Sequence, residues 1–234
     1  MDLKVLFGSQ TVLSGIDVSI QQGETVAVIG ESGCGKTVFM KTLVGLIPPT
    51  AGHVYFDSMD LATLSSAQLS DVRRRFGFVF QNAALFDSMT VFDNIAFPMR
   101  QSTDFSASEM REKVLRHLHE VGLPASAANK RPSELSGGMR KRVGIARAII
   151  LEPELVVYDE PTTGLDPIMS DVINELMLEV RQRYPVTSVI VTHDMRTAQK
   201  VADRVLMFYP RSRLGPNESQ VLYDGAPEAM EDHS

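Results

Sequence analysis

Residues 30–37 carry the strongest chemical signal in the sequence, because they read Gly-Glu-Ser-Gly-Cys-Gly-Lys-Thr in the pattern G-x-x-x-x-G-K-[ST]. Glycines leave space for several backbone N–H groups to converge on phosphate oxygens, and the start of a following helix adds free donors. The pattern predicts that Lys36 contacts the β- and γ-phosphates of a nucleotide and that the Thr37 hydroxyl coordinates Mg²⁺. A chance glycine-rich turn is the alternative, which the flanking strand-like and helix-like segments disfavour. The expected nucleotide-binding residues here are Gly30, Glu31, Ser32, Gly33, Cys34, Gly35, Lys36, Thr37 and Val38.

Two adjacent carboxylates, Asp159 and Glu160, end the apolar run 155–158. Successive residues of a strand point to opposite faces, so the two acids are expected to do different work. Asp159 is predicted to hold the Mg²⁺ shell, usually through water, and Glu160 to polarise an attacking water. Two solvated acids at an ordinary strand exit are the alternative when such a segment stands alone.

Residues 135–139, Leu-Ser-Gly-Gly-Met, offer a second phosphate cradle, with a hydroxyl, glycine amides and a helix N-terminus. One chain cannot easily present two cradles to one nucleotide. We therefore expect two copies of the chain head to tail, with Ser136, Gly137 and Gly138 of each covering the nucleotide of its partner. A plain helix start with Ser136 as N-cap is the other interpretation, and the two are compatible.

Hydrophobic periodicity predicts an α/β fold of the P-loop NTPase type, a mostly parallel sheet flanked by helices with an antiparallel β edge. Strand signals fade over about 82–149, which favours a helical subdomain inserted into a core of about 1–81 and 150–234 within one domain. Strands are expected over Val12–Ile20, Thr25–Ile29, His53–Phe56, Phe76–Phe80, Leu155–Tyr158, Ser188–Thr192, Val205–Phe208 and Gln220–Tyr223. Helices are expected over Thr37–Ile47, after capping residues Ser65 and Ser106, over Gly137–Ala148 and from Asp166 to Arg183.

Composition limits the class of protein. The 234 residues carry a net charge of -6, which disfavours nucleic acid as a partner. Cys34 is the single cysteine, so no intrachain disulfide can form, and we expect a small loop residue in a reducing compartment. No apolar run approaches the roughly 18–20 residues that span a bilayer, and no signal peptide is evident. We expect a soluble, cytoplasmic chain that reaches a membrane only by docking on another protein.

The ordered motifs resemble those of the ABC ATPase family along nearly the whole chain. Besides the three segments above, the resemblance rests on Gln81, on Gly164-Leu165-Asp166 and on His193. It implies ATP and Mg²⁺ as cofactors and Lys36, Gln81, Glu160 and His193 as catalytic groups. In the family, Gln81 senses Mg²⁺ and the membrane partner, Asp166 lies at the dimer seam and His193 contacts the γ-phosphate. Phe7 stands where the family has an aromatic ring that stacks on adenine.

A narrower resemblance is to the MlaF/Mkl-type ATPases of Mce-linked lipid transporters. It rests on Val38, on Met139 in place of the usual Gln, and on the segments 35–38, 80–87, 91–98, 133–142 and 164–168. It implies phospholipid or other lipid transport with integral-membrane permease subunits and a Mce-type lipid-binding subunit. The chain would then lie on the cytoplasmic face of the inner or plasma membrane, peripheral through its permease.

Other functions remain open at this point. The first alternative is the ATPase subunit of another ABC importer or exporter. A second alternative is a non-transport ABC ATPase acting on nucleic acid, but this would need a second ATPase domain or a long coiled-coil insertion, and the sequence shows neither. A third is a kinase-like P-loop enzyme, which would leave the Ser136 and His193 motifs unexplained. Arg140-Lys141-Arg142 is interpreted as a solvated helix face, and the apolar residues of 82–99 as subdomain core with some surface for a permease helix. The loop Pro210–Ser219 has no functional interpretation.

Overall fold

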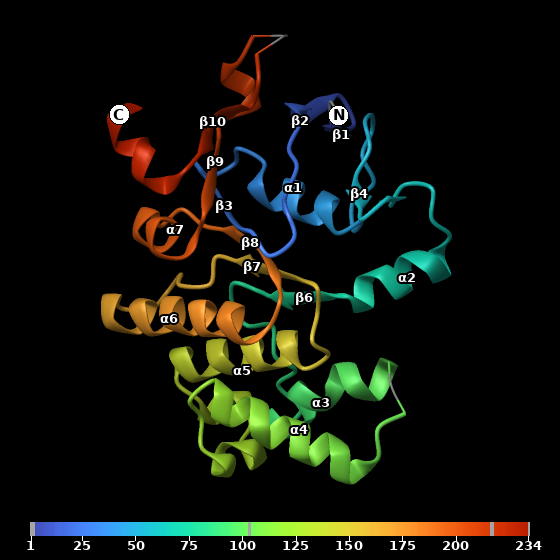
Figure 1. The fold of residues 1–234 in the computed structure, drawn as a ribbon, viewed down its shortest axis with the longest axis vertical. Coiled ribbons are helices and arrows are strands. Elements are labelled where there is room, and N and C mark those ends of the chain that lie inside the picture. Colours follow the sequence, from blue (N-terminus) through green and yellow to red (C-terminus); the bar gives the residue numbers. More distant parts are fainter. Residues whose placement is uncertain (1–2, 103, 216–217, 234) are drawn as a thin grey trace. The chain divides into compact units, whose positions relative to one another are not determined.

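The computed structural model describes residues 3–102, 104–215 and 218–233 (Figure 1). The expected loop Pro210–Ser219 therefore includes two residues, 216 and 217, that lie outside the described part. The chain divides into two compact units, Met1–Arg73 with Val189–Ser234 and Arg74–Ser188. Among the described residues no helix has both the length and the hydropathy to cross a membrane.

The first unit is built on strands in the neighbour order β10-β9-β3-β8. β3 (Thr25–Gly30) pairs in parallel with β9 (Arg204–Phe208), and β10 (Val221–Gly225) closes the edge antiparallel to β9. β8 (Thr187–Val191) has its last three residues in this unit. The apolar run of β3 is buried at residues 25–29, as expected for a strand covered on both faces.

In the described residues of the first unit, two hairpins and three α-helices accompany this sheet. β1 (Leu3–Phe7) pairs antiparallel with β2 (Gln10–Ile16), and β4 (Tyr55–Phe56) pairs with β5 (Met59–Asp60). The helices are α1 (Lys36–Leu43), α2 (Ser66–Arg74) and α7 (Met195–Val201), followed in the chain by the 3-10 turns η3 (Arg211–Arg213) and η4 (Pro227–His233). Ala198 of α7 packs on Ala27, Ile29 and Val205 of the sheet.

The second unit combines the parallel pair β6 (Phe76–Val79) and β7 (Leu155–Asp159) with four helices. These are α3 (Val91–Ser102), α4 (Ala107–Glu120), α5 (Gly137–Ile149) and α6 (Pro167–Arg183), with the short turns η1 (Ala125–Asn129) and η2 (Pro132–Glu134). α5 lies between α6 and the pair α3 and α4 (Figure 1).

Capping residues set several helix starts as predicted. Ser106 and Glu109 form a reciprocal capping box at α4, and the Ser136 hydroxyl accepts the Met139 N–H at α5. Asp166 accepts the Met169 N–H at α6, with Pro167 as the first helical residue. Over 82–149 the described residues form helices and turns and no strand, while the expected subdomain boundaries stay a prediction.

Several element boundaries differ from those expected. The helix that was expected to reach Ile47 ends at Leu43, and Gly45, two residues later, has a left-handed φ of 71°. The strand expected over Val12–Ile20 is β2, which begins at Gln10 and ends at Ile16, and the strand expected over His53–Phe56 is reduced to the two residues of β4. Helix α7 was not expected, because its seven residues are too few to show a helical period.

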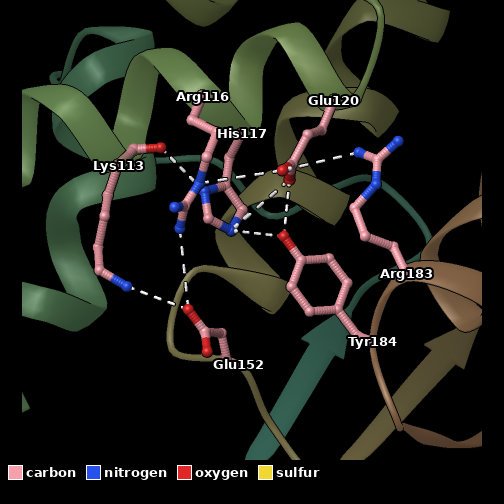
Figure 2. Close-up of polar contacts among 7 residues, drawn as sticks. All are labelled: Lys113, Arg116, His117, Glu120, Glu152, Arg183 and Tyr184. Carbon is pink, nitrogen blue, oxygen red and sulfur yellow. Dashed lines mark hydrogen bonds and ion pairs between the residues drawn. The ribbon is translucent and has the colours of Figure 1, made fainter.

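A buried polar cluster joins α4 to the residue that follows α6 (Figure 2). His117 is fully buried, and its Nδ1–H donates to the Lys113 carbonyl at 2.8 Å. The Tyr184 hydroxyl donates to Glu120 Oε2 at 2.7 Å and lies 3.3 Å from His117 Nε2. Burial lowers the pKa of His117, so the neutral ring with its proton on Nδ1 is the stable form in the folded chain.

Candidate functional site

The glycine-rich segment adopts backbone angles that require glycine at two of its positions. Gly30 has φ 145° and Gly35 has φ 100°, where an L side chain is strained. A Cβ atom at Gly30 would clash with the Phe208 carbonyl, and one at Gly35 would lie 2.7 Å from Leu13 Cδ2. The turn therefore packs directly on its neighbours before α1 begins at Lys36.

Lys36 is only 8% exposed, and its ammonium reaches back across the loop. Its Nζ donates to the Gly30 carbonyl at 2.7 Å and to the Glu31 carbonyl at 3.0 Å. Thr37, in the first turn of α1, is exposed, and Val38 is half-buried. Burial raises the pKa of the Cys34 thiol, so it stays protonated at neutral pH and is poorly suited to act as a nucleophile.

The first unit also carries Phe7 and His193. The Phe7 ring, at the end of β1, is 51% exposed, which leaves a face on which a flat group could stack. His193 is exposed and directly follows Thr192, whose N–H donates to the Val28 carbonyl at 3.1 Å. Asp194 caps α7 through the Arg196 N–H at 3.0 Å. The backbone on both sides of His193 is therefore fixed.

The acidic pair lies at the end of β7 in the second unit. Glu160 has a positive φ of 49°, an uncommon conformation for a residue with a side chain. Its Oε2 accepts the Thr163 hydroxyl at 3.0 Å, and its carbonyl accepts Lys141 Nζ at 3.2 Å. Asp159, the last residue of β7, is half-buried.

Lys141 contradicts the interpretation of residues 140–142 as a solvated helix face. It is 5% exposed and faces the acidic pair, because successive residues of a helix point about 100° apart and one of the three must turn inward. Burial lowers the pKa of Lys141, while the charges of Glu160 and Asp159 act in the opposite direction. Arg140 and Arg142 are half-buried and donate to the Leu135 and Gly122 carbonyls.

Gln81 follows β6 and is exposed, and the segment after it is strained. Ala83 and Ala84 have φ of 58° and 44°, the left-handed region that alanine avoids. The guanidinium of Arg147 holds both, donating to the Ala83 carbonyl at 2.6 Å and to the Ala84 carbonyl at 2.8 Å. Sequence reasoning missed Arg147 and the structural role of Lys141. Both lie three or four residues from buried residues of α5, and this helical spacing could have indicated that they point inward.

Residues 135–139 and Asp166 lie in this same unit. Ser136 is exposed at the start of α5, and Gly138 is buried where a Cβ would clash with the Met169 side chain of α6. Gly137 has room for a Cβ at ordinary contact distance from Leu165. Asp166 is exposed and caps α6. The turn before α6 and the start of α5 are therefore packed together.

An apolar cavity of about 410 Å³ lies beside the Gln81 segment. Its walls include the ring pairs Phe78–Phe80, with centroids 5.7 Å apart, and Phe86–Phe97, 4.8 Å apart. Phe80 is 39% and Phe86 42% exposed. Arg147 is the charged residue in its lining.

Oxygen atoms that could ligate Mg²⁺ beside a nucleotide are few and separate in the sequence. Among the described residues no group of three or more His, Cys, Asp or Glu side chains gathers as a cation site. Mg²⁺ at nucleotides is usually held by one or two protein oxygens together with phosphates and water. The exposed hydroxyl of Thr37 and the carboxylate of Asp159 are oxygen donors of the kind that such sites use.

Comparison with known families identifies the chain. The model of the ABC transporter family matches residues 13–163. The chain belongs to the ABC transporter family. The α/β fold predicted above, with its antiparallel edge, is confirmed by solved cassettes of this family.

Related proteins agree over most of the chain. The "Probable ribonucleotide transport ATP-binding protein mkl" of Mycobacterium leprae is 39% identical over 93% of this chain, which spans 63% of that protein's length. The "Intermembrane phospholipid transport system ATP-binding protein MlaF" of Haemophilus influenzae is 38% identical over 92% of this chain and 81% of that protein. The protein of the same name in Escherichia coli K12 is 37% identical over 94% of this chain and 82% of that protein. The resemblance to MlaF/Mkl-type ATPases is thus confirmed.

Solved structures of related cassettes cover nearly the whole chain. The dimeric ATP-binding cassette MJ0796, in a post-hydrolysis state bound to ADP and Pi, has a TM-score of 0.82 at 30% identity, covering 97% of this chain and 96% of that one. The cbiO1 subunit from Clostridium perfringens, part of the ABC transporter complex cbiONQ, has a TM-score of 0.87 at 27% identity, covering 99% and 88%.

Proposed function

We propose that this chain binds and hydrolyses ATP and drives a membrane permease. The observation that supports it most directly is the glycine segment 30–37, in which left-handed glycines and the Lys36 ammonium form a turn at the start of α1. Such a turn presents backbone N–H groups and a positive helix end to phosphate. The related cassette MJ0796 is bound to ADP and Pi.

The proposed chemistry is in-line attack of water on the γ-phosphate. Lys36 neutralises charge on the β- and γ-phosphates. The Thr37 hydroxyl and Asp159 would hold Mg²⁺, which would neutralise further phosphate charge, and Gln81 would sense the ion. Glu160 polarises the attacking water and His193 stabilises the γ-phosphate as charge builds on it. Phe7 stacks on the adenine.

We further propose that two copies of the chain close on two nucleotides. Ser136, Gly137 and Gly138 of one copy cover the ATP of the other, and Asp166 lies at the seam. The exposed Ser136 at a helix N-terminus supports this, because the positive end of a helix suits a phosphate from another molecule. The related cassette MJ0796 is a dimer.

The permease is proposed to dock at the apolar cavity beside Gln81. Exposed phenylalanines around a cavity of this size suit an apolar face of a partner helix. Charge reversal of the exposed Asp87 in this stretch is expected to uncouple hydrolysis from transport more than it harms folding. Through this contact the chain would lie on the cytoplasmic face of the membrane.

The transported cargo is proposed to be phospholipid, with a Mce-type lipid-binding subunit as a further partner. The names of the relatives point to two cargoes, intermembrane phospholipid for MlaF and ribonucleotide for mkl. Purification of the chain from native membranes separates them. Copurifying permease, Mce-type subunit and phospholipid would support the proposal, whereas a permease with neither lipid nor such a subunit would refute the lipid cargo and leave the ATPase standing.

Hydrolysis itself is tested by Glu160→Gln. This variant should bind MgATP and hydrolyse it very slowly, because only the water-polarising carboxylate is lost. It should also accumulate an ATP-dependent dimer in light scattering. Turnover near that of the wild type would refute the role of Glu160.

A further inference from the structure

Gln220 is a fully buried polar side chain in the first unit, directly before β10. Its Nε2 donates to the Cys34 carbonyl at 2.7 Å and to the Val12 carbonyl at 3.1 Å, and its Oε1 accepts the Ser14 N–H at 3.1 Å. Its own carbonyl accepts the Tyr209 N–H at 2.9 Å. An amide so buried is tolerated because these bonds satisfy it, and they fix its position.

Two of these contacts lie beneath the turn that ends the glycine segment. A Cβ on Gly35 would lie 3.2 Å from the Val12 carbonyl and 3.5 Å from Gln220 Nε2, so β2 and Gln220 form the floor on which the turn rests. Cys34 and Gly35 share one peptide group. In a trans peptide the C=O and N–H point in opposite directions, so a bond that holds the Cys34 carbonyl toward the floor directs the Gly35 N–H away from it.

We propose that Gln220 is a positioning residue for phosphate binding, which orients the Gly35 N–H and the start of α1 toward a nucleotide phosphate. The inference rests on the proposed function of residues 30–37.

A second contact to the glycine segment comes from Arg213 of η3 and is weaker. Arg213 Nη1 lies 3.0 Å from Glu31 Oε2, but the two side chains are 56% and 53% exposed. Exposed ion pairs are screened by water and contribute little to stability. Arg213→Ala is therefore expected to change nucleotide affinity less than twofold, and Gln220 is the contact to test.

The test measures ADP binding to the full chain with Mg²⁺ by titration calorimetry. Gln220→Met keeps the length of the side chain and removes all three of its hydrogen bonds. We expect ADP affinity to fall at least tenfold with a stoichiometry that stays near one. A merely structural role would instead lower the stoichiometry, because part of the protein would be unfolded, and would leave the affinity of the rest unchanged.

Asn94→Met is the matched control. Asn94 is also fully buried, and its amide accepts the Phe86 N–H at 2.8 Å and donates to the Phe86 and Thr90 carbonyls at 3.1 and 3.0 Å, all in the second unit. It should lose thermal stability much as Gln220→Met does and keep ADP affinity within twofold of the wild type.

Gln220→Glu serves if Gln220→Met does not fold. The carboxylate keeps an oxygen for the Ser14 N–H and removes the donor to the Cys34 carbonyl, so ADP affinity should again fall at least tenfold. ADP affinity within twofold of the wild type in a folded Gln220 variant would overturn the inference, as would failure of both variants to fold. If the wild type binds ADP and Lys36→Ala does not, the proposed function survives that result. If the wild type does not bind ADP, both proposals fail.

Discussion

Lys141→Met is the sharpest test of how the second unit supports catalysis. Lys141 Nζ donates to the Glu160 carbonyl at 3.2 Å, and Glu160 has the unfavourable φ of 49°. Methionine has nearly the same length and fills the same buried space without the donor. The variant therefore removes the bond that helps to hold the strained backbone of the proposed catalytic carboxylate.

The expected magnitude follows from that one bond. A hydrogen bond from a charged group contributes about 1.5–3 kcal/mol. If the loss falls on the orientation of Glu160 in the transition state, turnover falls about 10- to 100-fold, at about 1.4 kcal/mol for each factor of ten. Stability should change much less, because removing a buried ammonium also removes its desolvation cost.

Steady-state ATP turnover, ADP affinity and urea unfolding are measured on this variant and on Arg142→Met. Arg142 is next in the chain and also donates to a carbonyl at 3.2 Å, that of Gly122, away from the acidic pair. The control should keep turnover within about threefold of the wild type, a margin of about 0.7 kcal/mol. Equal turnover in the two variants would refute the argument, because the Lys141 bond would then have no part in placing Glu160.

Three further changes have defined outcomes. Gly35→Ala should lower the free energy of unfolding in urea by about 1–3 kcal/mol and weaken ADP binding, because the residue has φ 100° and a Cβ would crowd Leu13. The control Gly23→Ala is also strained, at φ 79°, but its Cβ would enter open space. It should lower stability without weakening ADP binding. Ser136→Arg should bind ATP yet fail to form the ATP-dependent dimer, and normal turnover would contradict the head-to-tail arrangement. Because burial lowers the pKa of His117 in the folded chain, the unfolded chain takes up the proton first as pH falls. The contribution of His117 to the free energy of unfolding is therefore fully present above about pH 6.5 and declines at lower pH, by at most about 1.4 kcal/mol per pH unit. Between about pH 5 and about 6.5, the free energy of unfolding of His117→Gln should lack this slope.

Features encoded in a few neighbouring residues were predictable from the sequence. Helix caps are one such feature, because the capping side chain lies within three residues of the N–H group that it binds. The helices α4, α5 and α6 each begin directly after the expected cap, which is Ser106, Ser136 and Asp166 in turn. The turn around Gly35 was predictable for the same reason, because its glycines and the following helix are adjacent in the chain.

Contacts between distant residues could not be predicted in this way. Gln220 binds Ser14 and Cys34, which are 206 and 186 residues away, so nothing near position 220 indicates its partners. Lys141 is an intermediate case. It falls on the buried stripe of α5 with Gly138, Ile145 and Ala148, spaced by three or four residues, so helical periodicity could have shown that it points inward.

Helix α5 links three features of the second unit through one buried and one half-buried cation. The exposed Ser136 caps its start, Lys141 holds the Glu160 carbonyl, and Arg147 holds the carbonyls of the strained Ala83 and Ala84. The two cations are six positions apart in the chain, about 9 Å along a helix axis. Positive φ angles at Glu160 and Ala83 persist only where their surroundings impose them. The backbones of Glu160 and Ala83 therefore both depend on α5. In the proposed mechanism, a second copy that closes on its nucleotide would displace α5. This displacement would move the water-polarising carboxylate and the permease-facing segment together.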